Sequence, residues 1–259
     1  MALKLENRAD EIMSRVAAGE SCSSIARSMG EYLQAVTSVV KKRLGKSSLR
    51  LDQGNVRYFQ YIDTPAKAYL LGFIAADGCI QNFTKSSVGL SITIHARDRE
   101  VLDYLKKEIG NEHQLQPVRN GEHIRFTLAS KQLVSDLESH GICQRKSLTM
   151  PDIFSPLPEG VRKYAILGYF DGDGSISSYN SGRKNYVQIR GTEEALLSIV
   201  RNLQITSYHM SRHDSIPSLV IGARNNVRKF YDIYEGCPVF LQRKKLIFDS
   251  IFRQDQTIS

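Results

Sequence analysis

The sequence lacks the features that mark secreted, zinc-stabilised and membrane-spanning proteins. Its four cysteines, Cys22, Cys79, Cys143 and Cys237, include no C-x-x-C pair, which argues against a zinc site or a disulfide framework. No apolar run approaches the ~20 residues that a membrane helix needs. The N-terminus, MALKLENRADEIM, has no long apolar segment of the kind found in signal peptides. We therefore expect an intracellular, cytoplasmic protein with reduced thiols and no membrane span.

The charge balance is basic. The chain carries 35 Lys and Arg against 27 Asp and Glu, a formal net charge of +8. This excess predicts a polyanionic partner, with nucleic acid first and an anionic membrane surface second, and an ordinary basic protein as the alternative. Apolar residues make up 41% of the 259 residues, which supports a folded core and argues against extended disorder.

Residues 7–44 are expected to be helical throughout, with the spacing of a helix-turn-helix. Ser21 and Ser23 are candidate N-caps of the second helix, and Gly30 is its expected end. Ala26 is small enough for two helices to cross closely, Gly30 permits the sharp turn, and Val36 packs the third helix onto the second. The alternative is a generic three-helix bundle.

In this interpretation the recognition helix covers roughly Leu33 to Arg43. It ends in three consecutive basic residues, which are candidate DNA contacts: Lys41, Lys42 and Arg43. The predicted domain spans residues 1–45, and the polar residues 46–55 read as a linker.

The rest of the chain divides into two halves, residues 56–150 and 151–259, at the proline-rich stretch MPDIFSPLPEG. Each half contains an apolar helix, a stretch of alternating apolar and polar residues, a helix, a further strand and another helix. Both halves also contain the triplet Gln-Arg-Lys, at 144–146 and 242–244. The pattern predicts two copies of one module.

Each module opens with the same unusual sequence, LLGFIAADGCI from Leu70 and ILGYFDGDGSI from Ile166. The two stretches are in strict register, separated by 96 positions: Gly72 and Gly168, Ala76 and Gly172, Asp77 and Asp173, Gly78 and Gly174. Small residues four apart share a helix face and allow two backbones to approach closely. We therefore predict that the two helices lie side by side, related by a pseudo-twofold axis, with Gly78 and Gly174 as their C-terminal stops.

This symmetry places Asp77 next to Asp173 at the negative ends of two helix dipoles. Two carboxylates there repel each other unless a cation binds between them. Oxygen ligands favour hard ions, so we predict Mg²⁺, with Mn²⁺ or Ca²⁺ as substitutes in binding. Carboxylates that share divalent ions are typical of phosphodiester hydrolysis. The alternative is that both aspartates merely cap helix ends.

On these residues, the chain from about 56 to 250 resembles the LAGLIDADG homing endonucleases in their single-chain, two-motif form. The resemblance implies metal binding by Asp77 and Asp173, helped by the carbonyls of Ala76 and Gly172. It also implies a basic residue near each scissile phosphate, Lys146 and Lys244, with Lys131 and Arg224 as weaker alternatives. The sequence departs from the family pattern at Ala75, where many members have an aspartate; its counterpart here is Asp171.

The implied fold is α+β: two αββαββα modules whose antiparallel sheets form a saddle on the major groove of DNA, preceded by the small helical domain. One face of each strand would meet DNA, which assigns these candidate contacts: Ser91, Thr93, His95, Arg125, Thr127, Gln188 and Arg190. Arg125 and Arg190 are candidates to read guanine and Gln188 to read adenine. His95 is a candidate to order an attacking water, with a plain surface histidine as the alternative.

The expected activity is metal-dependent, site-specific cleavage of double-stranded DNA by a monomer, at a long asymmetric target and with short 3′ overhangs. The setting would be the cytoplasm, an organelle or a phage-infected host. Two alternatives use the same scaffold: a non-catalytic DNA-binding regulator and an intron RNA maturase. The retained aspartate pair favours the enzyme over the regulator.

Overall fold

The computed structural model describes residues 7–17, 20, 22–44, 54–144, 146–179, 184–211 and 216–252. The chain divides into two compact units. The N-terminal unit comprises residues 1–52 with 112–114, and the main unit comprises residues 53–111 with 115–259. No helix in the described ranges is long and apolar enough to cross a membrane.

The N-terminal unit contains three short helices, α2 (Ala9–Ala17), α3 (Cys22–Met29) and α4 (Leu33–Leu44). Their apolar faces form a separate small core around Ile12, Ile25 and Val36, each fully buried. Gly30 follows α3 with a φ of 65°, the left-handed region that glycine adopts without strain. We had predicted Ser21 or Ser23 as the N-cap of this helix. Ser23 lies inside α3, so the prediction is wrong for that residue, and Ser21 lies outside the described residues.

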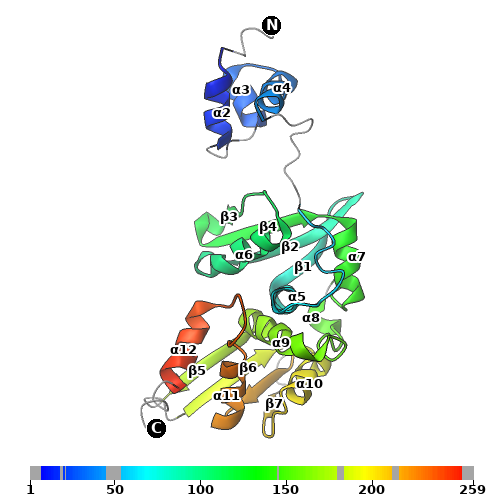
Figure 1. The fold of residues 1–259 in the computed structure, drawn as a ribbon, viewed down its shortest axis with the longest axis vertical. Coiled ribbons are helices and arrows are strands. Elements are labelled where there is room, and N and C mark those ends of the chain that lie inside the picture. Colours follow the sequence, from blue (N-terminus) through cyan, green and yellow to red (C-terminus); the bar gives the residue numbers. More distant parts are fainter. Residues whose placement is uncertain are drawn as a thin grey trace. The chain divides into compact units, whose positions relative to one another are not determined.

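The main unit contains two modules of the same construction (Figure 1). The first comprises α5 (Pro65–Asp77), β1 (Gly78–Thr84), β2 (Ser87–His95), α6 (Arg99–Ile109), β3 (Gln116–Val118), β4 (His123–Ala129) and α7 (Lys131–Ser139), followed by the short α8 (Lys146–Thr149). The second comprises α9 (Glu159–Asp173), β5 (Gly174–Tyr179), β6 (Lys184–Arg190), α10 (Glu193–Asn202), β7 (His209–Ser211), β8 (Ser218–Ile221), α11 (Arg224–Asp232) and α12 (Gln242–Phe252). Two single-turn 3₁₀ helices, Ala96–Asp98 and Arg119–Gly121, occur in the first module.

The two described sheets have matching topology. Each is four-stranded and antiparallel, with the orders β1-β2-β4-β3 and β5-β6-β8-β7. In β4 and β6 the apolar residues alternate with polar ones, so that one face joins the core and the other stays open. The α+β class and the repeated αββαββα order are therefore confirmed, and the arrangement is consistent with the predicted saddle.

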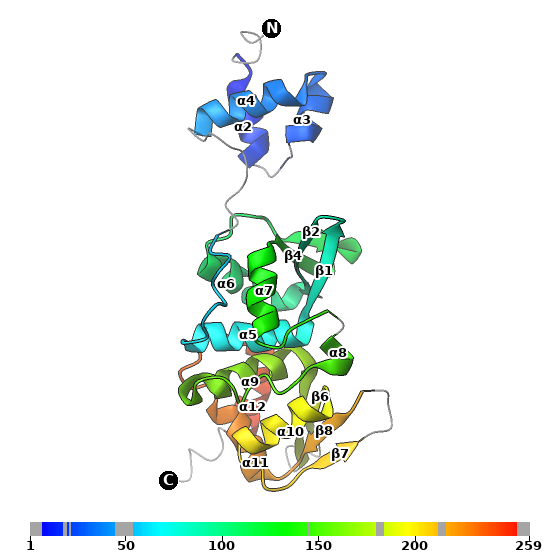
Figure 2. The same cartoon turned by 90° about the vertical axis from the view of Figure 1, so that its right-hand side faces the viewer.

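The helices α5 and α9 lie side by side at the centre of the main unit, between the two modules (Figure 2). Their contact is reciprocal and built on glycine. A methyl group on Gly72 would come closer than 3.0 Å to the carbonyl oxygen of Ala165, and one on Gly168 would do the same at Tyr69. These two contacts are related by the 96-residue repeat. No side chain fits between the backbones, which therefore touch directly.

The chain passes from each central helix into a strand without a loop. Gly78 and Gly174 follow the last helical residues, but both have extended backbone and begin β1 and β5. Both glycines end their helices, as predicted, and the chain is already extended at these positions. Glycine is needed because a Cβ there would collide with the carbonyl of Ile74 or Phe170, four residues earlier.

Candidate active site between the two central helices

Asp77 and Asp173 are the last residues of α5 and α9, at the same end of the helix pair. The Asp77 carboxylate lies against the backbone that carries Asp173. A methyl group on Gly172 would sit 3.2 Å from Asp77 Oδ2, and it would also collide with the side chain of Ala76. The crossing of two glycine-faced helices therefore brings the two carboxylates together.

The surroundings disfavour two bare negative charges. Burial, followed by repulsion from Asp173, raises the pKa of Asp77 to about 6. Burial also raises the pKa of Asp173, because nearby protein atoms displace much of the water around its carboxyl group. Part of the residue's surface nevertheless stays exposed to solvent. Lys146 and Lys244 oppose both shifts. A cation bound between the two carboxylates would offset the remaining energetic cost of keeping both of them negatively charged.

Lys146 and Lys244 lie beside this pair, and neither is a solvated surface lysine. They are only 7% and 3% exposed. Lys146 Nζ donates a hydrogen bond of 2.7 Å to the Ala76 carbonyl. Lys244 Nζ donates to three carbonyls, those of Phe170, Asp171 and Gly174. Burial lowers the pKa of both ammonium groups, that of Lys244 to about 8.

The two lysines differ in how firmly they are held. Lys146 begins the four-residue α8 and contacts one carbonyl. Lys244 lies in the eleven-residue α12, and its neighbour Arg243 forms a two-pronged ion pair with Asp98 of the first module, at 2.7 and 3.0 Å. The second lysine is thus anchored across both modules, and the sequence repeat gives no sign of this difference.

Asp171 explains part of the difference in how firmly the two lysines are held. It is 1% exposed and accepts hydrogen bonds from the Tyr69 hydroxyl (2.7 Å) and from the Leu241 N–H (2.8 Å). It therefore joins both central helices to the start of α12, which carries Lys244. Its counterpart, Ala75, is buried and has no polar group to do the same. In the sequence, Ala75 is the departure from the family pattern and Asp171 is its counterpart; the signal for a role of Asp171 was an acidic residue directly after the apolar run of residues 164–170.

The donor set at the helix ends fits a hard divalent cation. Two carboxylates with raised pKa values offer oxygen ligands. Among the described residues, no group of three or more His, Cys, Asp or Glu side chains gathers that could hold a metal ion, so the two carboxylates would leave the remaining ligand positions to carbonyl oxygens and water. The Ala76 carbonyl already accepts from Lys146, but a carbonyl oxygen has a second lone pair for a further partner.

The open sheet faces contain most of the predicted DNA contacts. Thr93, Arg125, Thr127 and Gln188 are half-buried there, and His95 and Arg190 are exposed. Arg125 Nε donates to Thr93 Oγ1 at 3.1 Å. Ser91 lies on the same face but is 6% exposed, between Cys79 and Thr127 on the flanking strands. This burial leaves Ser91 less surface for a DNA contact than the other assigned residues have, and its assignment stays a prediction.

Several residues on the same faces were missed from sequence. Gln81 shares the face of Cys79 on β1, opposite the buried Ile80. Tyr179 and Tyr186 stack on each other at the far end of the second sheet, with ring centroids 5.6 Å apart and planes 10° apart. The period-two signal of β1 was available, but we read the first strand only from Val88.

The N-terminal unit places its basic residues at the end of α4. Lys42 and Arg43 are exposed and Lys41 is half-buried. Arg43 forms an exposed ion pair of 3.3 Å with Asp10 of α2, a contact of small energetic weight. At the other end of α4, Tyr32 and Leu33 are large side chains that stay exposed.

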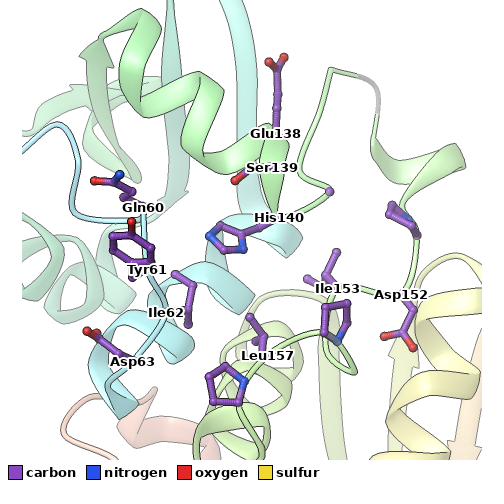
Figure 3. Close-up of a pocket in the computed structure, with 14 residues that line it drawn as sticks. Gln60, Tyr61, Ile62, Asp63, Glu138, Ser139, His140, Asp152, Ile153 and Leu157 are labelled. Carbon is purple, nitrogen blue, oxygen red and sulfur yellow. The ribbon is translucent and has the colours of Figure 1, made fainter.

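A separate cavity of about 570 Å³ lies at the other end of α5, where that helix begins. Figure 3 shows Tyr61 and Ile62, which precede α5, and His140, which follows α7, near Ile153 and Leu157 of the proline-rich segment. The His140 ring is hydrogen-bonded to the Phe59 carbonyl. The lining contains neither aspartate of the repeat and neither buried lysine, so this cavity is not the candidate active site.

Comparison with solved structures supports the fold. The chain is similar to the LAGLIDADG homing endonuclease I-LtrWI bound to target DNA, with a TM-score of 0.53 and 13% identity over 79% of this chain and 92% of that one. It is also similar to I-SmaMI bound to an uncleaved DNA target with calcium ions (0.52, 11%, 76% and 93%) and to the LAGLIDADG meganuclease I-AabMI bound to uncleaved DNA (0.52, 12%, 75% and 91%). No family model and no curated protein matches the sequence.

Proposed function

We propose that this protein is a metal-dependent, site-specific endonuclease of double-stranded DNA. The observation that carries the proposal is the meeting of Asp77 and Asp173 at one end of a glycine-built helix pair, each with a buried lysine beside it. Such a costly group of charges is expected where chemistry requires it. The DNA-bound similar structures and the net charge of +8 support DNA as the substrate.

In the proposed mechanism, Asp77 and Asp173 would hold hard divalent ions, Mg²⁺ in the first place. When bound, such ions would supply an activated water and neutralise charge on the phosphate. Lys146 and Lys244 point their ammonium groups at the same helix ends, where they stabilise the negative charge that grows on each scissile phosphate. One site for each strand implies a double-strand break, and the family resemblance implies short 3′ overhangs.

Recognition is assigned to the open faces of the two sheets. Arg125, Gln188 and their neighbours would enter the major groove, where base edges carry a distinguishable pattern of donors and acceptors. The N-terminal unit would add contacts through Lys41, Lys42 and Arg43 of α4 and so lengthen the site. The sheets belong to one chain and differ in sequence, so the target is asymmetric and the protein acts as a monomer.

The test is a cleavage assay on the DNA junction that results when the reading frame is deleted from its flanking sequence. Wild-type protein should linearise a plasmid carrying this junction with Mg²⁺ and not with EDTA. Asp77→Asn and Asp173→Asn should each reduce cleavage by ~10²-fold or more while duplex binding persists. Asp103→Asn is the matched control, because Asp103 is exposed and forms an ion pair with Arg99 on the same helix, α6. Normal cleavage of both strands by either active-site variant would remove the metal assignment.

The helical N-terminal unit favours one competing function, a DNA-binding regulator on the same scaffold. A regulator would bind the same junction with high affinity and leave both strands intact under all metal conditions. The assay above separates the two functions directly. An intron maturase would instead bind the intron transcript more tightly than the duplex, which a competition measurement detects.

A further inference from the structure

A cavity of about 560 Å³ lies where the beginning of α9 meets the end of α10 and α11. These two helices lie on the side of α9 that faces away from α5 (Figure 1, Figure 2). The cavity is at the opposite end of α9 from Asp173, roughly 20 Å away at about 1.5 Å per helical residue, and no described strand contributes to its lining. Four of its ten lining residues are basic: Arg162, Lys163, Arg201 and Lys229.

These basic residues are only partly neutralised. Lys163 Nζ lies over an aromatic ring and Lys229 Nζ donates to a carbonyl at the end of α10, and among the described residues neither lysine pairs with a carboxylate. Arg201 forms a partly exposed ion pair of 3.3 Å with an aspartate of the proline-rich segment. The lining also contains two acidic residues, of which Asp232 is already paired with Arg228. The cavity therefore keeps an excess of positive charge, which attracts an anion.

This charge belongs to the second module and not to the repeated fold. The 96-residue repeat places Ala66 at the position of Arg162. The helices α7 and α11 each have nine residues, and the sixth is Asp136 in α7 and Lys229 in α11. Two of the four positive charges therefore have no basic counterpart in the first module. The fold itself does not require them, which points to a ligand.

The end of α10 departs from the repeat in a second way. The helices α6 and α10 end in the same turn, in which an N–H donates to the carbonyl five residues earlier, at 2.8 and 2.9 Å. The residue before this N–H has a positive φ in both modules, 68° at Gly110 and 51° at Gln204. Glycine adopts this conformation without strain, whereas glutamine does so at an energetic cost. Gln204 lines the cavity, and strained positions of this kind are typical of residues whose side chain serves binding.

We propose that this cavity binds a small phosphorylated ligand of nucleotide size that carries two or more phosphate groups, such as a nucleoside triphosphate. The volume lies in the range of small-molecule sites, ~300–1,000 Å³. The arginine and lysine side chains would hold the phosphates through charge-assisted hydrogen bonds, and Gln204 would contact the ligand from the end of α10. This binding goes beyond the proposed nuclease function and does not depend on it, since neither aspartate of the repeat and neither lysine beside them lines the cavity.

The remaining lining suits a nucleobase. Leu203 and Ile233 offer apolar surface. The Asn202 amide nitrogen donates to the hydroxyl groups of Ser155 and Ser198 at 3.1 and 3.0 Å, which leaves its oxygen as an acceptor for a ligand. The exocyclic amino groups of adenine, guanine and cytosine are donors of the kind that this oxygen accepts.

The first experiment titrates the full-length protein with ATP and with inorganic triphosphate in a calorimeter. EDTA is present, so that no divalent ion bridges the phosphates to the two aspartates. Both probes should bind, and Arg162→Ala and Lys229→Ala should each weaken binding by about 10-fold, the loss expected for one charge-assisted hydrogen bond. Two controls should bind like wild type: Lys67→Ala, the counterpart of Lys163 on α5, and Arg125→Ala on the open face of the first sheet.

The second experiment separates binding from folding. Gln204→Gly should weaken ATP binding and yet unfold at the same or a higher urea concentration, because glycine adopts the left-handed conformation without strain. A residue with a merely structural role would change stability and leave the affinity unaltered. Unchanged affinity for ATP in Gln204→Gly would therefore contradict the contact with Gln204.

Any of four results overturns the inference. Neither probe binds; Arg162→Ala and Lys229→Ala both bind ATP like wild type; Arg125→Ala weakens ATP binding as much as they do, which would place the ligand on the sheet face; or a short single-stranded RNA binds through Arg162 and Lys229 and ATP does not. None of these measurements involves cleavage, so a protein that cuts no DNA but binds ATP through these residues would refute the proposed function and leave this site standing.

Discussion

Replacing Gly168 with alanine should separate the two central helices. The new methyl group would collide with the carbonyl oxygen of Tyr69, and it would lie 2.9 Å from the backbone nitrogen of Phe73. Both atoms belong to the backbone of α5 and cannot rotate away as a side chain can. The helices themselves must move, although nearly every residue around the crossing is buried.

The cost follows from packing. A gap of roughly 0.5–1 Å forfeits about a quarter to a half of the dispersion energy of each contact it opens. Overpacking costs about 1–3 kcal/mol where side chains can adjust, and this site faces rigid backbone. Alanine favours the helix over glycine by up to about 1 kcal/mol, which offsets part of this loss. Taking the upper end of the overpacking cost, we expect a net loss of roughly 2 kcal/mol in the free energy of unfolding, a fall in Tm of about 4–8 °C for a unit of this size.

The assay is urea unfolding followed by circular dichroism, with Gly160→Ala as the matched control. Gly160 lies in the same helix, and a methyl group there meets nothing within 4 Å, so this variant should be neutral or slightly stabilising. The double variant of Gly72 and Gly168 should lose less than the sum of the two single losses, because one separation relieves both collisions. Equal stabilities of Gly168→Ala and Gly160→Ala would refute the direct backbone contact.

Three further outcomes are expected. Asp171→Ala should lower stability and slow cleavage while leaving Asp77 in place, because the start of α12 loses its acceptor for the Leu241 N–H; unfolding and cleavage assays check both. Burial favours the neutral form of Asp152, but hydrogen bonds from the backbone and hydroxyl of Ser155 and from Ser198 outweigh it and lower the pKa of that carboxyl. The stability it contributes is therefore present above its unfolded pKa of about 3.9 and is lost as pH falls through the lower folded value, so urea titrations of Asp152→Asn and wild type should converge in acid and diverge towards neutral pH. Burial raises the pKa of the Cys237 thiol to about 12, whereas Cys79 is exposed; mass spectrometry after iodoacetamide treatment at neutral pH should find Cys79 alkylated and Cys237 intact.

The structural features that follow a strict period along the chain could be predicted from the sequence. The 96-residue repeat gave the two modules, and the four-residue spacing of Gly72 and Ala76, and of Gly168 and Gly172, indicated a close helix crossing. Alternating residues from Val88 to Ile94 gave β2, which the structure extends from Ser87 to His95. Such patterns reflect local geometry, since 3.6 residues per helical turn and two per strand repeat decide which side chains share a face.

Features that depend on residues far apart in the sequence could not be predicted from it. Sequence alternation put Ser91 on the open face, but its burial comes from Cys79 and Thr127 on adjacent strands. The Gln-Arg-Lys triplets look alike, yet only tertiary contacts show that Arg243 bridges to Asp98 and that Lys244 is enclosed by three carbonyls. The sequence showed Asp171 as the counterpart of Ala75, but it did not reveal the hydrogen bonds that Asp171 accepts from Tyr69 and Leu241.

The sequence by itself determined the repeated module, the paired helices and the identity of the two acidic residues at their ends. The tertiary structure decided how unequal the two halves are: Lys244 is held more firmly than Lys146, and Asp171 binds the chain at the start of the helix that carries Lys244. The physical reason is that periodicity is a property of neighbouring residues along the chain. Burial, pKa and charge pairing are set by groups that the fold brings together from positions 70 to 145 residues apart.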